Sequence, residues 1–229
     1  MEQLPGGYTL NICENAFPLS TDSMLLADFV RLPKNACVLD LGSGCGTLGT
    51  LLCARDPQCT VTGIEIDRLA HCAALDNIER NRLSHRMQSI WGDLADMNTL
   101  VSPGSFSCCV SNPPYFSSGP ASKNRTAARR EDSCTLEQLF YAAAWAVKFG
   151  GDFFLVHRPE RLAELIHCAC QTNLEPKRLC LVRHTKGSPV SLVLVHCRKG
   201  AKPGLSWEEL YLFQPDGSPS EAYKKIYHL

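Results

Sequence analysis

Glycines and acidic residues gather at one point of the sequence, where a strand would pass into a helix. The segment Asp40-Leu-Gly42-Ser-Gly44-Cys-Gly46 begins inside the apolar run Cys37–Leu41. Glycines at such a turn allow a tight bend and let a ligand approach the backbone closely. No Lys-Ser or Lys-Thr pair follows, which excludes the phosphate-binding loop of nucleoside triphosphate enzymes. The turn therefore predicts a site for another small molecule.

The acidic residue at the mouth of the turn indicates the charge of that ligand. Asp40 would repel a pyrophosphate but attract a cation, and S-adenosylmethionine carries an ammonium and a sulfonium group without any phosphate. Gly44, Gly46 and Gly49 also match the GxGxxG pattern, and Glu65 follows about twenty residues later, so a nicotinamide dinucleotide stays open. We favour S-adenosylmethionine as the cofactor.

Two further acidic residues mark the next two expected strands: Glu65 lies at the carboxyl end of the second, and Asp93 follows the third. Glu65 can accept hydrogen bonds from both ribose hydroxyls, since a carboxylate has two acceptor oxygens, and Asp93 can accept from the adenine amino group. In the alternative interpretation both acids only cap the helices that follow them. The residues predicted to bind the cofactor are Asp40, Gly42, Gly44, Gly46, Glu65, Ile66, Asp93 and Asn112.

A stiff loop, Asn112-Pro113-Pro114-Tyr115, directly follows the fourth expected strand. Its two prolines fix φ and remove two backbone donors, which leaves the loop rich in acceptors. The Asn112 side-chain oxygen and the Pro113 carbonyl could accept both hydrogens of a planar exocyclic amine and so aim the nitrogen lone pair at a methyl donor. Tyr115 could stack on the planar group. These four residues are the predicted catalytic set, and the alternative is a merely rigid loop with a core tyrosine.

The glycine turn and the Asn112 loop resemble those of class I methyltransferases of the Asn-Pro-Pro-Tyr type. More narrowly, the chain is similar to the bacterial tRNA(Val) adenine-N6-methyltransferase family, which modifies the adenosine beside the anticodon. Segments outside the core carry this likeness: Phe17-Pro-Leu-Ser-Thr-Asp22-Ser-Met-Leu-Leu26, Ala128-Arg129-Arg130-Glu131 and Ser220-Glu-Ala-Tyr223. The resemblance implies methylation of adenine N6 in an RNA, with tRNA favoured. It also implies that Asp22 lies near the methionine end of the cofactor, whereas otherwise Asp22 would cap a helix over Met24–Val30.

A polar stretch, Ser117–Asp132, follows the Asn112 loop and is rich in cations. Long loops in compact domains are usually functional. Cations at the mouth of the site could hold the phosphates that flank an extruded base. The predicted substrate-binding residues are Tyr115, Phe116, Lys123, Arg125, Arg129 and Arg130. An ordinary surface loop is the alternative.

Apolar runs that alternate with helical spacing would place these motifs at the ends of strands. Strands are expected over Cys37–Leu41, Thr60–Ile66, Gln88–Trp91, Phe106–Ser111 and Asp152–His157, with a final antiparallel pair over Arg178–His184 and Val190–Cys197. Helices are expected from the glycine turn to Ala54, and over Asp67–Asn81, Thr135–Lys148 and Pro159–Gln171. The predicted fold class is α/β, with a Rossmann-like doubly wound, mostly parallel seven-stranded sheet and an antiparallel C-terminal hairpin.

The composition indicates one globular domain. With 229 residues, 45% of them apolar, we expect an N-terminal segment 1–35, a cofactor-binding core 36–200 and a C-terminal extension 201–229. No apolar run approaches the roughly 18 residues that span a membrane, and the first residues do not resemble a signal peptide, so a cytoplasmic protein without a membrane partner is expected. The thirteen cysteines lack metal-site spacing, so we expect buried thiols and no metal. The oligomeric state stays open.

The charge is distributed unevenly along the chain. Residues 1–119 hold 7 Lys/Arg and 12 Asp/Glu, whereas residues 120–229 hold 16 and 11, which gives net charges of −5 and +5. A basic second half could face a polyanion such as RNA. A solvated surface with a random asymmetry would explain the numbers equally well.

Other functions are also compatible with the sequence. Guanine N2 in ribosomal RNA and the glutamine amide of a protein pose the same chemical problem as adenine N6. The glutamine enzymes carry a helical domain ahead of the core, for which the N-terminal segment 1–35 is too short. Enzymes that methylate adenine in duplex DNA need an extra base-recognition domain, and no segment of this sequence is expected to supply one. A binding module with a cofactor pocket but no catalysis is the alternative outside enzymes, and the intact Asn112 loop disfavours it.

Overall fold

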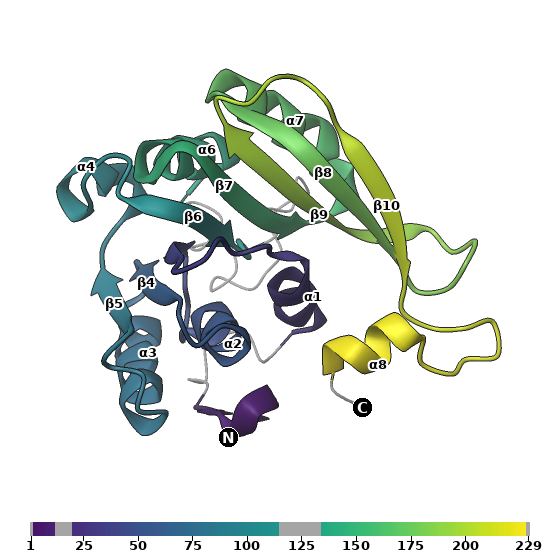
Figure 1. Ribbon diagram of the computed structural model, residues 1–229, viewed down its shortest axis with the longest axis horizontal. Helices are drawn as coiled ribbons and strands as arrows, with labels where there is room; N and C mark the ends of the chain where they lie inside the picture. Colours follow the sequence, from purple (N-terminus) through teal and green to yellow (C-terminus); the bar gives the residue numbers. More distant parts are fainter. Residues whose placement is uncertain (1, 12–19, 115–133, 228–229) are drawn as a thin grey trace, which may run out of the picture.

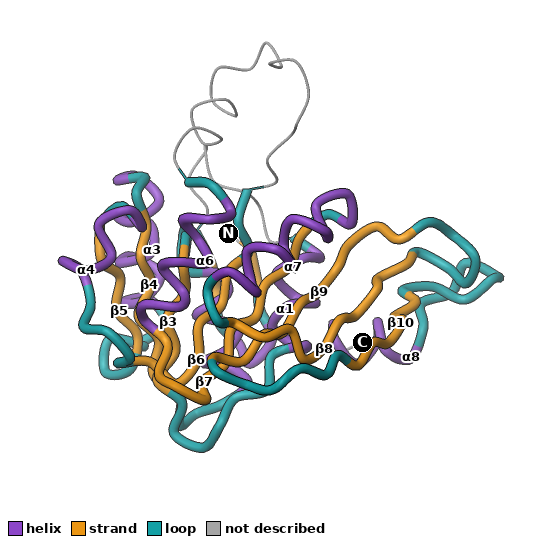
Figure 2. The backbone as a smooth tube through the Cα atoms, turned by 90° about the horizontal axis from the view of Figure 1, so that it is seen from above, coloured by secondary structure: helices purple, strands orange, loops and turns teal. Residues whose placement is uncertain are grey.

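The computed structural model describes residues 2–11, 20–114 and 134–227. Within them the main sheet has eight strands in the order β10-β8-β9-β7-β6-β3-β4-β5, which follow one another from edge to edge (Figure 2). The strands are β3 Cys37–Leu41, β4 Thr60–Glu65, β5 Met87–Trp91, β6 Phe106–Ser111, β7 Val147–His157, β8 Leu174–Arg183, β9 Val190–Lys199 and β10 Ser206–Tyr211. A separate ribbon pairs β1 Glu2–Gln3 with β2 Thr9–Leu10.

The strand directions confirm the predicted mixed, doubly wound sheet. β3 is parallel to both β4 and β6, and β6 is parallel to β7, whereas β9 runs antiparallel to β7 and β8. From β3 the chain first moves outward through β4 and β5 and then returns to β6 on the other side of β3. The loops after β3 and β6 therefore open on the same crevice, which is where open α/β sheets bind ligands.

Helices cover both faces of the sheet (Figure 1). One layer contains α1 Thr21–Phe29, α2 Thr47–Arg55 and α3 Arg68–Arg80, and the other contains α4 Met97–Leu100, α6 Leu136–Ala146 and α7 Leu162–Gln171. The remaining helices are α8 Glu221–Tyr227 and the short 3₁₀ helices η1 Pro5–Gly7, η2 Leu94–Asp96 and η3 Pro159–Arg161. Each layer buries its own apolar cluster against the sheet, as expected when consecutive strands are joined by helices.

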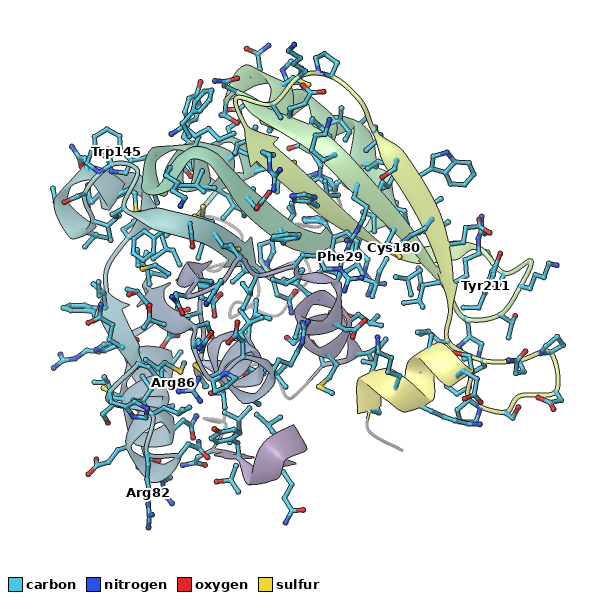
Figure 3. All side chains as sticks on the ribbon, in the orientation of Figure 1. Phe29, Arg82, Arg86, Trp145, Cys180 and Tyr211 are labelled. Carbon is cyan, nitrogen blue, oxygen red and sulfur yellow. The ribbon has the colours of Figure 1, made fainter. Side chains whose placement is uncertain are left out.

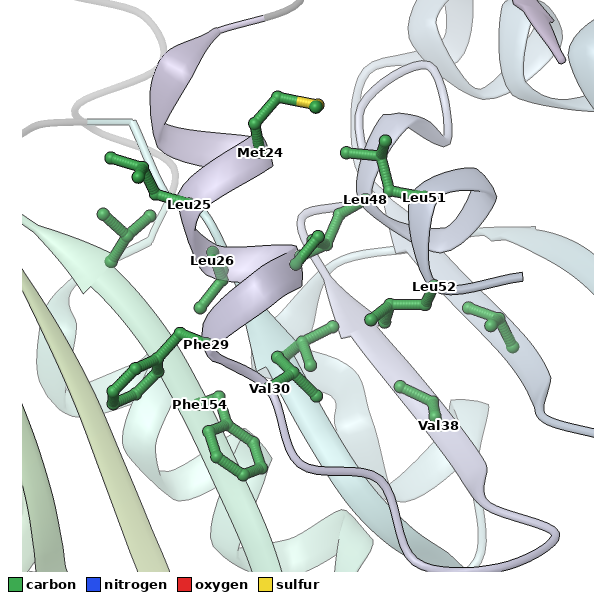
Figure 4. Packing of buried hydrophobic residues seen from close by; sticks show 14 of the residues in the cluster. Met24, Leu25, Leu26, Phe29, Val30, Val38, Leu48, Leu51, Leu52 and Phe154 are labelled. Atoms are coloured by element: carbon green, nitrogen blue, oxygen red, sulfur yellow. The ribbon is translucent and has the colours of Figure 1, made fainter. Parts of the chain in front are cut away.

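Helix α1 is held firmly against the rest of the domain. Its apolar residues, among them Met24, Leu26 and Phe29, pack between α2 and β7 (Figure 4). At its end, Arg178 of β8 donates from Nη2 to the Phe29 carbonyl at 2.6 Å and stacks on the Phe29 ring at 3.8 Å. Phe29 and Cys180 of β8 belong to the same buried cluster (Figure 3). The position of α1 is therefore set by both the sheet and the neighbouring helix.

The sheet has one strand more than the sequence predicted. β10 adds to the edge of the sheet beside β8, within the expected C-terminal extension. Its side chains from Ser206 to Glu209 are exposed, so the strand lacks the apolar face that reveals a strand in a sequence. Charged side chains such as Glu208 and Glu209 are typical of edge strands, because they discourage pairing with other chains.

The second difference concerns the glycines at 150 and 151. The sequence predicts a helix that reaches Lys148 and a strand that begins only at Asp152, but the helix ends at Ala146 and both glycines lie inside β7. Gly150 has a φ of +74°, and a Cβ atom on Gly151 would lie 2.8 Å from the Ser107 carbonyl. The glycines thus permit an irregular stretch in the pairing of β6 with β7, where the register shifts after Phe106.

Other sequence expectations can be compared with the described residues. Eight of their twelve cysteines are buried, in keeping with the predicted role of small apolar residues. No described helix has the length and apolarity needed to cross a membrane. Across the ranges 2–11, 20–114 and 134–227, His, Cys, Asp and Glu side chains form no group of three suited to a metal ion.

Candidate active site

The carboxyl ends of β3, β4, β5 and β6 bring the predicted site residues to one edge of the sheet. Asp40 of β3 lies opposite Gly63 of β4 and Val110 of β6, so Glu65 and Asn112 each follow two residues beyond that level. Asp93 likewise follows two residues after Trp91, the partner of Glu65 in β5. The register of the parallel strands therefore gathers the two acids and the asparagine around the glycine turn.

The glycine turn has an open side and a packed side. A Cβ atom added to Gly42 or Gly44 would meet no heavy atom within 4 Å, and both residues have positive φ values, +73° and +56°. On the packed side, Cβ atoms at Gly46 and Gly49 would lie 3.0 and 2.7 Å from Cε of Met87. The first two glycines therefore border free space that a ligand could occupy, whereas the later two allow close helix-to-strand packing.

Backbone and side-chain hydrogen bonds fix the turn. The N–H groups of Gly42 and Ser43 both donate to the Ile64 carbonyl at 3.0 Å. Asn77 of α3, which is fully buried, donates from Nδ2 to the Cys45 carbonyl at 3.0 Å. The turn is thus pre-organised by the neighbouring strand and by a helix outside the crevice.

Asp40 is a buried carboxyl group with an unsatisfied oxygen. It is 2% exposed, and its Oδ2 has no hydrogen-bond partner among the described residues. Burial raises the pKa of Asp40 to about 7, and the nearby negative charge of Glu65 contributes to the increase. A cationic hydrogen-bond donor would supply both the missing partner and the opposite charge.

Glu65 is also buried, and two backbone groups hold its carboxylate. Its Oε2 accepts from Gly44 N at 2.7 Å and its Oε1 from Asp67 N at 2.8 Å. Asp67, and not Glu65, caps α3 by accepting from Leu69 N and Ala70 N. Because each carboxylate oxygen has a second lone pair, Glu65 keeps acceptor capacity for hydroxyl groups of a ligand.

Asp93 and Ile66 line the β5 side of the same edge. Asp93 is the N-cap of η2 and accepts from Ala95 N at 2.9 Å, as the alternative interpretation of this acid expected. Ile66 is 44% exposed, and its carbonyl accepts from the Trp91 indole N–H at 3.0 Å. Trp91, itself 57% exposed, was not anticipated from the sequence, although an aromatic residue directly before Gly92 and Asp93 was a visible signal.

Asn112 reaches from the end of β6 to helix α1. Its Nδ2 donates to the hydroxyl oxygen of Ser23 at 2.9 Å. The preceding residue, Ser111, is fully buried and donates to the Leu41 carbonyl at 2.8 Å, which ties the end of β6 to β3. Pro113 is buried and Pro114 is half-buried. Ser23 was not predicted, although it directly follows Asp22 in the segment that carried the family likeness.

The remaining predicted residues divide into two groups. Asp22 lies in the first turn of α1, whose N-cap is Ser20, so the alternative that Asp22 itself caps this helix is wrong. The substrate-binding residues lie outside the described part of the chain: Tyr115, Phe116, Lys123, Arg125, Arg129 and Arg130.

Fold and site together define an α/β methyltransferase of class I, and comparisons with known proteins agree. Residues 19–167 match the model of the methyltransferase small domain family, and the chain belongs to this family. It is therefore an S-adenosylmethionine-dependent methyltransferase. A predicted O-methyltransferase from Agrobacterium tumefaciens has a similar structure, with a TM-score of 0.77 at 20% identity over 91% of this chain and 96% of that one, and this likeness concerns the fold alone.

Curated relatives confirm the narrower resemblance. A tRNA1(Val) (adenine(37)-N6)-methyltransferase from Photobacterium profundum is 27% identical over 90% of this chain and 87% of the relative. A protein of the same description from Porphyromonas gingivalis strain ATCC 33277 is 33% identical over 73% of this chain and 69% of the relative.

The buried carboxyl of Asp40 predicts a pH-dependent stability of the ligand-free protein. A folded-state pKa raised from 3.8 to about 7 contributes stability that is fully present below the lower value and is lost as the pH rises through the upper one. Asp40→Asn, which mimics the protonated acid, should therefore be more stable than the wild type, by a margin that grows by roughly 1–3 kcal/mol between pH 5 and pH 8.

Urea unfolding of both proteins at the two pH values measures this margin. Asp96→Asn, at an exposed carboxylate of η2, is the matched control and should show no such growth. A margin for Asp40→Asn that is the same at both pH values would contradict the raised pKa.

Proposed function

We propose that this methyltransferase modifies the exocyclic N6 of adenine in an RNA, with a transfer RNA as its substrate. The observation that carries the proposal is the position of Asn112, at the mouth of the crevice that also holds Asp40 and Glu65. The curated relatives support the choice of base and polymer, since the names of both state adenine N6 in a tRNA.

The acids and glycines of the turn fit the cofactor. In the proposed arrangement Asp40 Oδ2 and the region of Asp22 face its methionine end, Glu65 accepts from the ribose hydroxyls, and Asp93 accepts from the adenine amino group. Gly42 and Gly44 keep the backbone clear of the ligand, Gly46 lets the turn pack closely against Met87, and Ile66 offers an exposed apolar surface to the adenine ring. When bound, S-adenosylmethionine supplies an electrophilic methyl group on a positively charged sulfur.

Asn112 and Pro113 act on the nucleophile. An aromatic amine is a weak nucleophile because its lone pair is delocalised into the ring. Acceptors placed on both N–H groups favour a pyramidal nitrogen, whose lone pair then points along the transfer direction. Asn112 Oδ1 and the Pro113 carbonyl are the proposed acceptors, and Tyr115 is the proposed stacking partner. No general base is required before transfer, because the proton can leave after the nitrogen has become positively charged.

The identity of the acceptor polymer can be tested directly. Wild-type protein is incubated with tritiated S-adenosylmethionine and, separately, with total RNA and total protein from a strain lacking the gene. We expect label in small RNA, recovered as N6-methyladenosine after digestion, and far less label in the same time with an Asn112→Ala control. Label recovered as N2-methylguanosine, or in protein only, would replace the proposal with one of the two alternatives that share this chemistry.

Glu65→Gln tests the cofactor site. The variant keeps the size of the side chain but loses the charge that strengthens hydrogen bonds to hydroxyl groups, so affinity for S-adenosylhomocysteine should fall about 10- to 100-fold. Calorimetry measures this affinity. Glu79→Gln, which alters an exposed glutamate of α3, is the control. Wild-type affinity in Glu65→Gln would remove Glu65 from the site, and tight binding of NADH to the wild type would favour a dinucleotide pocket.

Asn112→Ala tests the chemical step. Because the amide acts on the nucleophile and not on the donor, single-turnover methyl transfer should slow by about 100-fold or more while affinity for S-adenosylhomocysteine stays within a few-fold. The two measurements separate catalysis from cofactor binding. If the variant retained most of the wild-type rate, the proposed role of the amide would be wrong.

A further inference from the structure

Among the described residues, Ser23 of helix α1 forms a side-chain hydrogen bond with Asn112 of the Asn-Pro-Pro-Tyr loop. This serine is 6% exposed, and its Oγ accepts from Asn112 Nδ2 at 2.9 Å. Its own hydroxyl lies 3.4 Å from Ser20 Oγ, which also accepts from the Ser23 backbone N–H as the N-cap of α1. Ser20 thus offers an acceptor for the Ser23 proton, and a lone pair of Ser23 then remains for Asn112.

We propose that Ser23 is a positioning residue, which fixes the Asn112 amide so that Nδ2 faces α1 and Oδ1 faces the substrate nitrogen. The inference rests on the proposed function and deepens it. An asparagine amide can rotate by half a turn, and the rotated form would present a donor to the two N–H groups of the substrate. That form repels the nucleophile, so an acceptor on the opposite side of Asn112 selects the productive orientation.

The packing of α1 against the domain fixes the position of Ser23. Apolar neighbours of Ser23 in α1, including Met24 and Leu25, are buried against the domain (Figure 4). At the other end of the helix, Arg178 binds the Phe29 carbonyl. A serine on such a helix holds its Oγ in place far better than one on a loop, and a displacement of about 1 Å at a reacting group can slow transfer by about 100-fold.

The contact itself can be tested without any substrate. In ¹⁵N-labelled protein the side-chain NH₂ signals of Asn112 are assigned by their loss in Asn112→Asp. In Ser23→Ala we expect one of the two NH₂ protons to move upfield and both to exchange faster with water. Ser220→Ala is the matched control, because Ser220 is a similarly buried serine, 7% exposed, that caps α8 and whose hydroxyl donates to the Tyr211 carbonyl. Unchanged Asn112 signals in Ser23→Ala would overturn the proposal, whichever polymer is methylated.

Kinetics tests the consequence, with whichever acceptor took label in the assay above. Ser23→Ala should slow single-turnover transfer by about 10- to 100-fold and leave affinity for S-adenosylhomocysteine within about two-fold. Ser23→Thr, which keeps the hydroxyl, should restore most of the rate. The double variant of Ser23→Ala and Asn112→Ala should be no slower than Asn112→Ala alone, because Ser23 acts only through Asn112.

Two kinetic results would overturn the proposal. One is an equal loss of rate in Ser220→Ala, which would show that general loosening of the domain is responsible. The other is a further loss in the double variant, which would show that Ser23 acts on the reaction independently of Asn112. Label in protein instead of RNA would refute the proposed substrate but leave the role of Ser23 to be decided by these same measurements.

Discussion

The parallel register of β3, β4 and β6 is the constraint on which the whole site depends. Because Asp40 is level with Gly63 and Val110, the residues that follow β4 and β6 must emerge beside the glycine turn. Reversal of strand order between β3 and β6 opens the crevice at that level. A slip of one residue in either pairing would turn Glu65 or Asn112 toward the opposite face of the sheet. The buried hydrogen-bonded ladder is therefore as important to the chemistry as the side chains.

This register has an electrostatic cost. It places two buried carboxyl groups, Asp40 and Glu65, near each other, and burial together with their mutual repulsion raises the pKa of Asp40 to about 7. Glu65 is compensated by two backbone N–H groups, whereas Asp40 Oδ2 is left without a partner among the described residues. An arrangement that destabilises the ligand-free protein in this way is typical of a binding site for a cation, where function and stability conflict.

The sequence predicted the parts of the molecule whose signals are local. The glycine turn, the acids at strand ends and the final hairpin all follow from short patterns, and the structure places them as expected. β10 was missed because an exposed edge strand has no apolar periodicity, and its pairing with β8 is a tertiary contact. Ser23 was missed for a related reason: it lies 89 residues from Asn112, and nothing in its own neighbourhood reveals a partner at that distance.

The proposed acceptor pair, Asn112 Oδ1 and the Pro113 carbonyl, would not by itself select the substrate. Asn112 Oδ1 and a proline carbonyl would bind the N–H groups of adenine, guanine or a glutamine amide in the same way, so discrimination between them must arise outside this pair. A rigid asparagine makes such discrimination more effective, since a fixed acceptor forms a good hydrogen bond only with a nitrogen presented at one angle and distance. Ser23 can therefore contribute to specificity as well as to rate, although it contacts no substrate. If Ser23 positions Asn112 as proposed, helix α1 belongs to the active site, and the contacts of Arg178 with Phe29 that attach it to the sheet would support catalysis from a distance.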